Sequence, residues 1–224
     1  MENYCVLESK TRGMYLTSFN KQQEKLMDFS ASDEEGKGIK GPHSPSFMEE
    51  KLFRSRSLTI FGEINEKLAR SVTERLLALA SENSDPIFLY VSSPGGHVES
   101  GDVIYDMIKF IKPEVKVIGT GWVASAATTI YLAADKGSRY SLPNTRFLIH
   151  QPLGGSKGDA TDIAIQADQI VRTRARINQL IAGETGQSIE RVTEDTDRDF
   201  WMSVDEAIEY GIVGKVISSI DEIQ

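Results

Sequence analysis

The apolar run Ile87–Val91, followed directly by Ser92-Ser93-Pro94-Gly95-Gly96, constrains the fold of this chain most strongly. A strand that is apolar at every position is typical of a parallel sheet covered by helices on both faces. Similar short runs occur at 58–61 and 115–118, and amphipathic segments lie between them. This alternation predicts an α/β fold in which helices pack on a mainly parallel sheet.

The spacing of apolar residues along the sequence predicts where the helices lie. Asn65 precedes a segment in which Leu68, Val72 and Leu76 recur every four residues, as on one face of a helix. A long helix is expected at 161–182, with an inner side formed by Ile163, Ala167, Ile170, Ile177 and Ile181. The other expected elements are helices at 99–111, 124–134, 189–195 and 204–210, the last capped by Ser203, and strands at 139–142, 146–150 and 213–217.

The N-terminal region differs from the rest of the chain. Residues 30–47 read SASDEEGKGIKGPHSPSF, without a helical or strand period. Such a composition cannot bury enough apolar surface to offset its ordering entropy. We therefore expect residues 1–50 to form a mobile extension, with the globular part beginning near Leu52.

Charge and composition exclude several classes of protein. The net charge of −8 argues against nucleic acid as a main partner and against a polybasic membrane anchor. The uncharged stretch 117–134 contains too many glycines, serines and threonines for a membrane span. The single cysteine, Cys5, excludes an internal disulfide framework and fits a reducing compartment, so we expect a cytoplasmic protein. One cysteine and three scattered histidines also exclude a Cys/His metal cluster. The histidines are His43, His97 and His150.

Two turns after expected strands are candidates for chemistry, because ligands of open α/β folds bind where the strands end. Ser93-Pro94-Gly95-Gly96 could present backbone N–H groups to a ligand, although a plain turn is the commoner explanation of such a motif. Ser125 lies where a strand is expected to give way to a helix. Its hydroxyl could be a nucleophile near the positive helix end, or it could simply cap the helix.

A nucleophilic serine needs a base and a carboxylate that orients it. His150 ends the apolar run 147–149, and a rigid strand end suits a general base. Alternatively, His150 could be a structural residue at the edge of the core, with its imidazole hydrogen-bonded to a backbone carbonyl. For the carboxylate, the residues leave Glu194, Asp195, Asp197 and Asp199 equally open.

Several ordered motifs make residues 52–224 resemble the ClpP family, the proteolytic subunits of the Clp protease. These motifs are Phe88–Gly96, Ile104-Tyr105-Asp106, Phe110–Pro113, Leu142-Pro143-Asn144, Ile149–Gly155, Ala160–Ile163 and Asp195–Asp199.

The resemblance implies a role for particular residues. The family's catalytic serine, histidine and aspartate match Ser125, His150 and Asp199. The backbone N–H donors of its oxyanion hole match Gly96 and Ala126. No cofactor is implied.

The resemblance also implies a fold, an assembly and partners. The expected fold is the ClpP/crotonase-like arrangement of stacked βαβ units, with a head at 51–150 and 184–224 and a protruding handle helix within 151–183. Family members form two stacked seven-membered rings, and an ATP-dependent unfoldase of the AAA+ class, such as ClpX, ClpA or ClpC, delivers unfolded proteins. The apolar docking pocket of the family matches Phe88, Tyr90 and Phe110.

This chain departs from the family pattern around the nucleophile. Ala126-Ala127 replaces the usual Met-Gly, Trp122 and Val123 replace smaller or more polar residues, and the extension before residue 51 is unusually long. Two alternatives to an active serine endopeptidase therefore remain. One is a weakly active scaffold subunit that shares a ring with a second ClpP paralogue, and the other is an acyl-CoA hydratase or isomerase of the crotonase superfamily.

Overall fold

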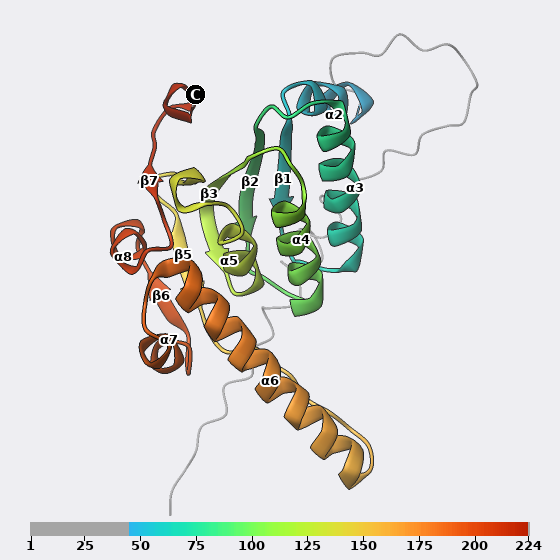
Figure 1. Ribbon diagram of the computed structural model, residues 1–224, viewed down its shortest axis with the longest axis vertical. Helices are drawn as coiled ribbons and strands as arrows, with labels where there is room; N and C mark the ends of the chain where they lie inside the picture. Colours follow the sequence, from blue (N-terminus) through green and yellow to red (C-terminus); the bar gives the residue numbers. More distant parts are fainter. Residues whose placement is uncertain (1–44, 224) are drawn as a thin grey trace, which may run out of the picture. The chain divides into compact units, whose positions relative to one another are not determined.

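The computed structural model describes residues 45–223, and in them seven strands form one sheet (Figure 1). Five strands lie side by side in the order β1-β2-β3-β4-β7, and every neighbouring pair among them is parallel. Off this path, β5 pairs in parallel with β3, and β6 pairs antiparallel with β5. The strands are β1 Ser57–Phe61, β2 Ile87–Ser93, β3 Val115–Ala124, β4 Arg139–Ser141, β5 Arg146–Ile149, β6 Phe200–Met202 and β7 Lys215–Val216.

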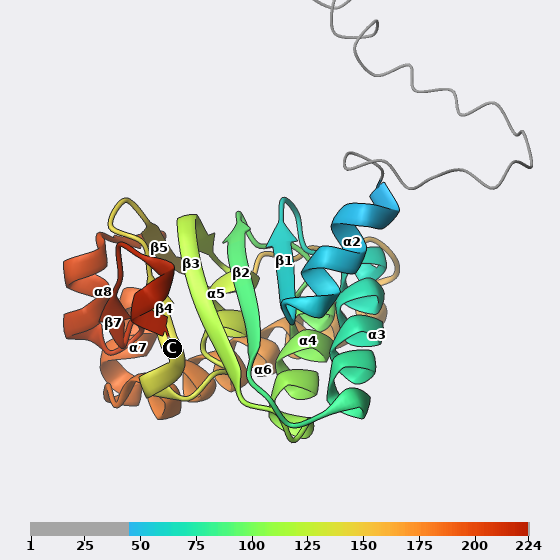
Figure 2. The same cartoon turned by 90° about the horizontal axis from the view of Figure 1, so that it is seen from above.

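Helices alternate with these strands along the chain, which confirms the predicted α/β class. Figure 2 shows α3 and α4 along one side of strands β1 to β3. The helices are α2 Pro45–Arg54, α3 Glu66–Glu82, α4 Val98–Phe110, α5 Ala126–Tyr131, α6 Ala160–Thr185, α7 Ile189–Asp195 and α8 Val204–Tyr210, with short 3₁₀ turns η1 Lys136–Ser138 and η2 Ile220–Ile223.

The two faces of β2 are covered differently. Ile87, Leu89 and Val91 are fully buried in the main core, to which α3 and α4 also contribute. Phe88 and Tyr90 point to the opposite face and are only half-buried, so the expectation of a strand buried on both faces is wrong. That second face is covered in part by a small cluster of Ile118, Ile217 and Ile223, the last two from the C-terminal segment.

Local capping sets where two helices begin. The side chain of Asn65 accepts a hydrogen bond from the N–H of Leu68 and begins α3. Ser203 and Glu206 form a reciprocal capping box at the start of α8. Both helices begin where the sequence predicts, because a cap needs only residues that are neighbours in the chain.

Several elements differ from the prediction, among them the helix expected at 124–134, which is α5 at Ala126–Tyr131. Helix α2 begins at Pro45, so the described structure starts before Leu52, and the rest of the predicted extension, residues 1–44, lies outside the described residues. Strand β3 continues to Ala124 instead of ending at Ile118, because Gly121 adopts a positive φ within a register shift against β2. The short strand β6 was not predicted, since pairing with β5 is what makes it a strand.

Helix α6 projects away from the sheet (Figure 1). Only its C-terminal half is packed in the core, with Ile177 and Ile181 buried. Ile163 is 44% exposed, so the expected inner side does not extend over the first half of the helix. No helix in residues 45–223 is both long and apolar enough to cross a membrane.

Candidate active site

Ser125 occupies the junction between β3 and α5 in a strained conformation. Its φ of 56° and ψ of −125° lie outside the regions that non-glycine residues ordinarily adopt. The main chain is held there by a hydrogen bond from the N–H of Ser125 to the carbonyl of Leu148, and the carbonyl of Ser125 accepts from the N–H of Thr128. The Ser125 side chain caps no helix N–H, which removes the capping interpretation.

The turn after β2 lies directly against this junction. An added Cβ on Gly95 would stand 2.6 Å from the Cβ of Ser125 and 2.7 Å from the carbonyl oxygen of Ala124. Gly95 also has a φ of 92°, which favours glycine. Gly95 is therefore required by its close approach to the serine, and a plain surface turn would not require it.

His150 reaches the serine because β5 lies beside β3. Ala124 stands opposite Leu148 in this parallel pair, so the residues that follow the two strands emerge side by side. Nε2 of His150 lies 2.8 Å from the hydroxyl oxygen of Ser125. The imidazole side chain is 16% exposed, which leaves it largely shielded but open to the pocket.

Asp199 reaches the other side of the imidazole from the residue before β6. The antiparallel pairing of Ile149 with Phe200 places the two neighbouring residues together. Nδ1 of His150 lies 2.9 Å from Oδ1 of Asp199. Because an ionised carboxylate can only accept, Nδ1 carries the proton and Nε2 is left to accept from the Ser125 hydroxyl. The structure thus brings the three predicted side chains into one hydrogen-bonded chain.

Two of the other acidic candidates, Asp195 and Asp197, are engaged elsewhere. The carboxylate of Asp195 accepts from the hydroxyl of Tyr210, and burial, with that bond, raises the pKa of Tyr210 well above its usual value. The Asp197 carboxylate pairs with Arg174 at 3.1 Å. Of the four acidic residues that the sequence leaves open, Asp199 is the one that contacts His150.

A buried threonine orients the segment that carries Asp199. The carbonyl of Thr196 accepts from the N–H of Gln151, the residue after His150, at 2.6 Å. The hydroxyl of Thr196, which is fully buried, reaches Oδ1 of Asn178 in α6. Sequence reasoning missed Asn178 and Thr196, because both look like ordinary polar residues until the fold brings them together.

Two backbone N–H groups near Ser125 have no partner within the described residues. Ala126 opens α5, where the first N–H groups of a helix lack intrahelical acceptors. Gly96 pairs with Ile64 in an isolated parallel bridge, in which His97, not Gly96, donates to the Ile64 carbonyl. An added Cβ on Gly96 would stand 2.3 Å from the Ile64 carbonyl oxygen, so this position also requires glycine.

A narrow pocket opens beside Ser125 and His150, with a free volume of about 20 Å³. Its walls come from α4, α5, α6 and the end of β5. The residues that line it, besides the serine and histidine, are Val98, Asp102, Ala126, Thr129, Ile149, Pro152, Ile177 and Ile181. The described residues contain no group of three His, Cys, Asp or Glu side chains placed to hold a metal ion.

Comparison with known families identifies the chain. Residues 43–220 match the family model described as Clp protease. This chain belongs to the Clp protease family.

Curated relatives of this Clp protease chain carry matching names. A protein of Rhizobium etli called ATP-dependent Clp protease proteolytic subunit 3 is 54% identical over 78% of this chain and 90% of its own length. Proteolytic subunit 2 of Pseudomonas aeruginosa is 50% identical over 85% of this chain and 94% of its own. The names of these relatives support a protease activity for this chain.

Solved structures agree with the family. ClpP1 from Listeria monocytogenes is 54% identical, with a TM-score of 0.72 over 79% of this chain and 99% of that chain. A mutant of the same protein is 56% identical at a TM-score of 0.75, again over 79% and 99%. The chain therefore has the ClpP fold, as the sequence predicts.

The three expected docking residues of this Clp protease chain do not share one face. Phe88 and Tyr90 lie on the face of β2 that turns away from the main core. Phe110 ends α4, whose Ile104 and Ile108 pack in the main core, and its side chain is 78% exposed. The expected docking role of these three side chains stays a prediction.

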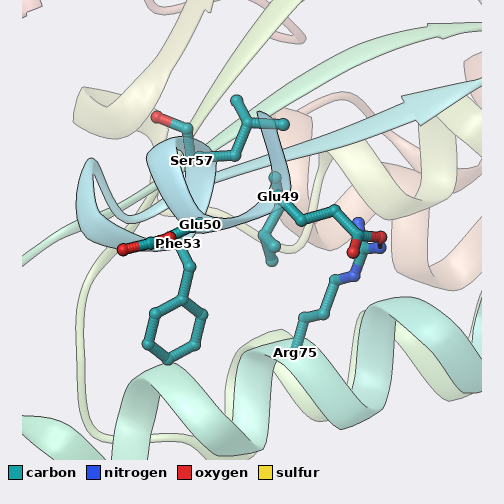
Figure 3. A pocket seen from close by; sticks show the side chains of 7 residues that line it. Glu49, Glu50, Phe53, Ser57 and Arg75 are labelled. Carbon is teal, nitrogen blue, oxygen red and sulfur yellow. Dashed lines mark hydrogen bonds and ion pairs between the residues drawn. The ribbon is translucent and has the colours of Figure 1, made fainter. Parts of the chain in front are cut away.

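A larger cavity, of about 370 Å³, lies between α2, β1 and α3, away from the serine. Arg75 of α3 reaches toward Glu49 of α2 across it, at 3.3 Å (Figure 3). The cavity is lined by Glu49, Glu50, Leu52, Phe53, Ser57, Leu58 and Arg75. That lining contains no imidazole or thiol, so it does not repeat the hydroxyl–imidazole contact found at Ser125.

Proposed function

We propose that this chain is a serine endopeptidase in which Ser125, His150 and Asp199 form the catalytic triad. The two hydrogen bonds that join Ser125 to His150 and His150 to Asp199 carry the proposal. This order of contacts, from hydroxyl to imidazole to carboxylate, is the arrangement by which a neutral serine becomes a nucleophile. The strained backbone at Ser125 supports the proposal, because strain concentrates at functional sites.

Each group has one task in peptide hydrolysis. The Ser125 oxygen attacks the scissile carbonyl while its proton passes to Nε2 of His150, and Asp199 stabilises the imidazolium that forms. The imidazolium then gives the proton to the leaving amine, so that the peptide C–N bond breaks and an acyl-enzyme remains. Water, deprotonated by the same imidazole, releases the acyl group and restores the serine.

The free N–H groups of Gly96 and Ala126 are proposed as the oxyanion hole. Negative charge develops on the carbonyl oxygen in the transition state, and fixed donors stabilise it without reorganisation. One such donor is worth roughly 3 kcal/mol in a comparable protease. Replacing the family's Met-Gly by Ala126-Ala127 leaves the Ala126 N–H in place, so the donor does not depend on that side chain.

We further propose that the chain works within the Clp system, as a cytoplasmic subunit of two stacked seven-membered rings fed by an AAA+ unfoldase. Membership of the Clp protease family supports this assembly. The sequence has no Gly-x-x-x-x-Gly-Lys-Ser/Thr motif, so ATP would act on the partner. Unfolded proteins would be the substrates, while short peptides would enter without help.

One sample of the full chain tests the proposal. Native mass spectrometry reports the assembly, a short fluorogenic peptide reports hydrolysis, and a fluorophosphonate probe reports the reactivity of Ser125. We expect a ring-sized mass, peptide cleavage and labelling that is lost in Ser125→Ala. An assembled wild-type protein that neither cleaves nor labels would contradict the proposal and favour the scaffold alternative.

A further inference from the structure

The carboxylate of Asp199 has few contacts that could fix its position. Its side chain is 65% exposed, and among residues 45–223 the carboxylate has one hydrogen-bond partner, Nδ1 of His150 at 2.9 Å. A single contact of an exposed carboxylate contributes little by itself, because the gain is offset by the entropy of holding the side chain still. The main chain that carries Asp199 therefore has to place the carboxylate against the imidazole.

Gln151, the residue after His150, holds that main chain at two points. Its backbone N–H donates to the carbonyl of Thr196 at 2.6 Å. Its side-chain amide nitrogen, Nε2, donates to the carbonyl of Asp197 at 2.7 Å. Both carbonyls belong to the turn that leads to Asp199, so one residue next to the base binds the segment that carries the carboxylate.

Regular secondary structure does not fix this turn. Helix α7 ends at Asp195, and the pairing of β6 with β5 begins only at Phe200. Residues 196–199 lie between these two elements. The amide of Gln151 thus supplies an anchor inside the turn, where neither the helix nor the sheet does.

Within the described residues, one other side chain donates to the same carbonyl. Nη1 of Arg198 lies 3.0 Å from the Asp197 oxygen, but Arg198 belongs to the turn itself and its side chain is 86% exposed. Gln151 instead joins the turn to the segment of His150. It also precedes Pro152, and a residue before proline is restricted to extended conformations, so the main chain on which this contact is built is stiff.

We infer that Gln151 is a positioning residue whose side-chain amide sets the contact between His150 and Asp199. The inference rests on the proposed function. Asp199 can hold the imidazole in its working tautomer only while this contact is made. A misplacement of about 1 Å can lower the rate of an enzyme by about a hundredfold. Gln151 acts through Asp199 and takes no part in making or breaking bonds.

Gln151→Met tests the inference, because it keeps the length of the side chain and removes the donor. We expect kcat for a fluorogenic peptide to fall by at least about tenfold. KM should stay within about twofold of wild type, because Gln151 does not line the pocket beside Ser125. Wild-type kcat in this variant would overturn the inference.

Gln151→Asn gives the same test with a different side chain. It keeps an amide but is one methylene too short to reach the carbonyl of Asp197, so kcat should fall in the same way. Native mass spectrometry checks the assembly of each variant, and Gln151→Asn decides if Gln151→Met does not assemble. Failure of both variants to assemble would also overturn the inference, because Gln151 would then be needed for folding and not for positioning.

A double variant separates positioning from a general loss of structure. In Asp199→Ala the contact that Gln151 supports is already absent. Adding Gln151→Met should therefore slow labelling by a fluorophosphonate by less than about twofold, since two residues that act through one contact do not have additive effects. A further tenfold loss would show that Gln151 acts independently of Asp199, which contradicts the inference.

Gln187 provides the matched control. Its Nε2 also donates to a main-chain carbonyl, that of Tyr210 at 2.9 Å, and this contact involves no residue of the proposed triad. Gln187→Met should keep kcat within about twofold of wild type, and an equal loss in both variants would assign the effect to stability alone. A wild-type protein that neither labels nor hydrolyses peptide contradicts the proposed function, whereas an active wild type with an unaltered Gln151→Met variant contradicts only this inference.

Discussion

Gly95 and Ser125 approach so closely that a methyl group on the glycine would lie 2.6 Å from the Cβ of the serine. The two residues belong to different turns, one after β2 and the other after β3. The turn that contains Gly95 thus packs directly against the strained backbone of Ser125. This contact links a motif that looks structural in the sequence to the proposed nucleophile.

The first prediction concerns this contact. Gly95→Ala should reduce peptide hydrolysis by at least about tenfold, because the new Cβ would displace the Ser125 junction and its φ of 92° would be strained. A residue forced into such a conformation costs about 1–3 kcal/mol, so the melting temperature should also fall. Gly137→Ala is the control, since an added Cβ there meets nothing within 4 Å. Wild-type activity in Gly95→Ala would show that the contact does not position Ser125.

The second prediction concerns the proposed triad. Ser125→Ala and His150→Ala should each lower kcat by at least about a thousandfold, and the double variant should lose little more, because triad members act as a unit. Hydrolysis of a fluorogenic peptide measures kcat for each variant. Native mass spectrometry checks that the assembly of each variant is unchanged. If the two losses multiplied instead, Ser125 and His150 would not act in one step.

The third prediction concerns a buried ion pair that anchors the end of α6. The Arg139 side chain is 1% exposed and pairs with the carboxylate of Glu184, while its other N–H groups bond the carbonyls of Ala134 and Leu132. Glu184→Ala leaves that buried guanidinium without its counter-ion. We expect a loss of about 3 kcal/mol in the free energy of unfolding.

Urea unfolding at one fixed protein concentration measures this loss. Arg172→Ala is the matched control, because its pair with Asp168 is exposed at 72% and 54% of the two side chains. Such a pair should contribute less than about 0.5 kcal/mol. Equal effects of the two substitutions would mean that burial does not strengthen the Arg139–Glu184 pair.

The fourth prediction concerns the pKa of Glu206 in the capping box of α8. Hydrogen bonds from the Ser203 backbone N–H, and then from its hydroxyl, lower this pKa below its usual value. Because the folded pKa is depressed, the ionised carboxylate stabilises the fold above the unfolded pKa, and this stabilisation is lost as the pH falls through the folded pKa.

Ser203→Ala removes the hydroxyl but keeps the backbone donor at position 203. The pKa of Glu206 should therefore rise only part of the way to its usual value, as followed by NMR titration of the glutamate carboxyl carbons. Glu222, whose pKa is lowered mainly by the N–H groups of Ser218 and Ser219, serves as internal control and should not move. A full return of the Glu206 pKa would assign the whole effect to the hydroxyl.

The fifth prediction concerns docking of an unfoldase. Phe110 is 78% exposed, so Phe110→Ala should leave the melting temperature and short-peptide cleavage unchanged. If this side chain binds the partner, degradation of a folded protein by the complex with an AAA+ unfoldase should fall several-fold. Phe61→Ala, at a side chain that is 58% exposed, is the control. A parallel loss of peptide cleavage in Phe110→Ala would argue for an internal role instead.

The sequence alone determined the elements whose causes are local. Asn65 and Ser203 begin their helices as predicted, and α7 and α8 have the predicted bounds, because caps and apolar spacing act between neighbours in the chain. The family motifs also predict Ser125, His150 and Asp199 as the catalytic residues, although the residues by themselves leave four carboxylates open. Where a segment's environment is supplied by distant residues, sequence reasoning was less accurate, as for the exposed first half of α6.

Only the tertiary structure decided which side chains meet. Strand β6 exists because it pairs with β5, and that pairing brings Asp199 to His150 across 49 residues of chain, while Asp195 and Asp197 turn to other partners. In the same way Asp102 of α4 pairs with Arg176 of α6, 74 residues further along the chain. Hydrogen bonds and ion pairs act over a few ångströms, so their partners depend on how the strands align and the helices cross, which no local pattern encodes.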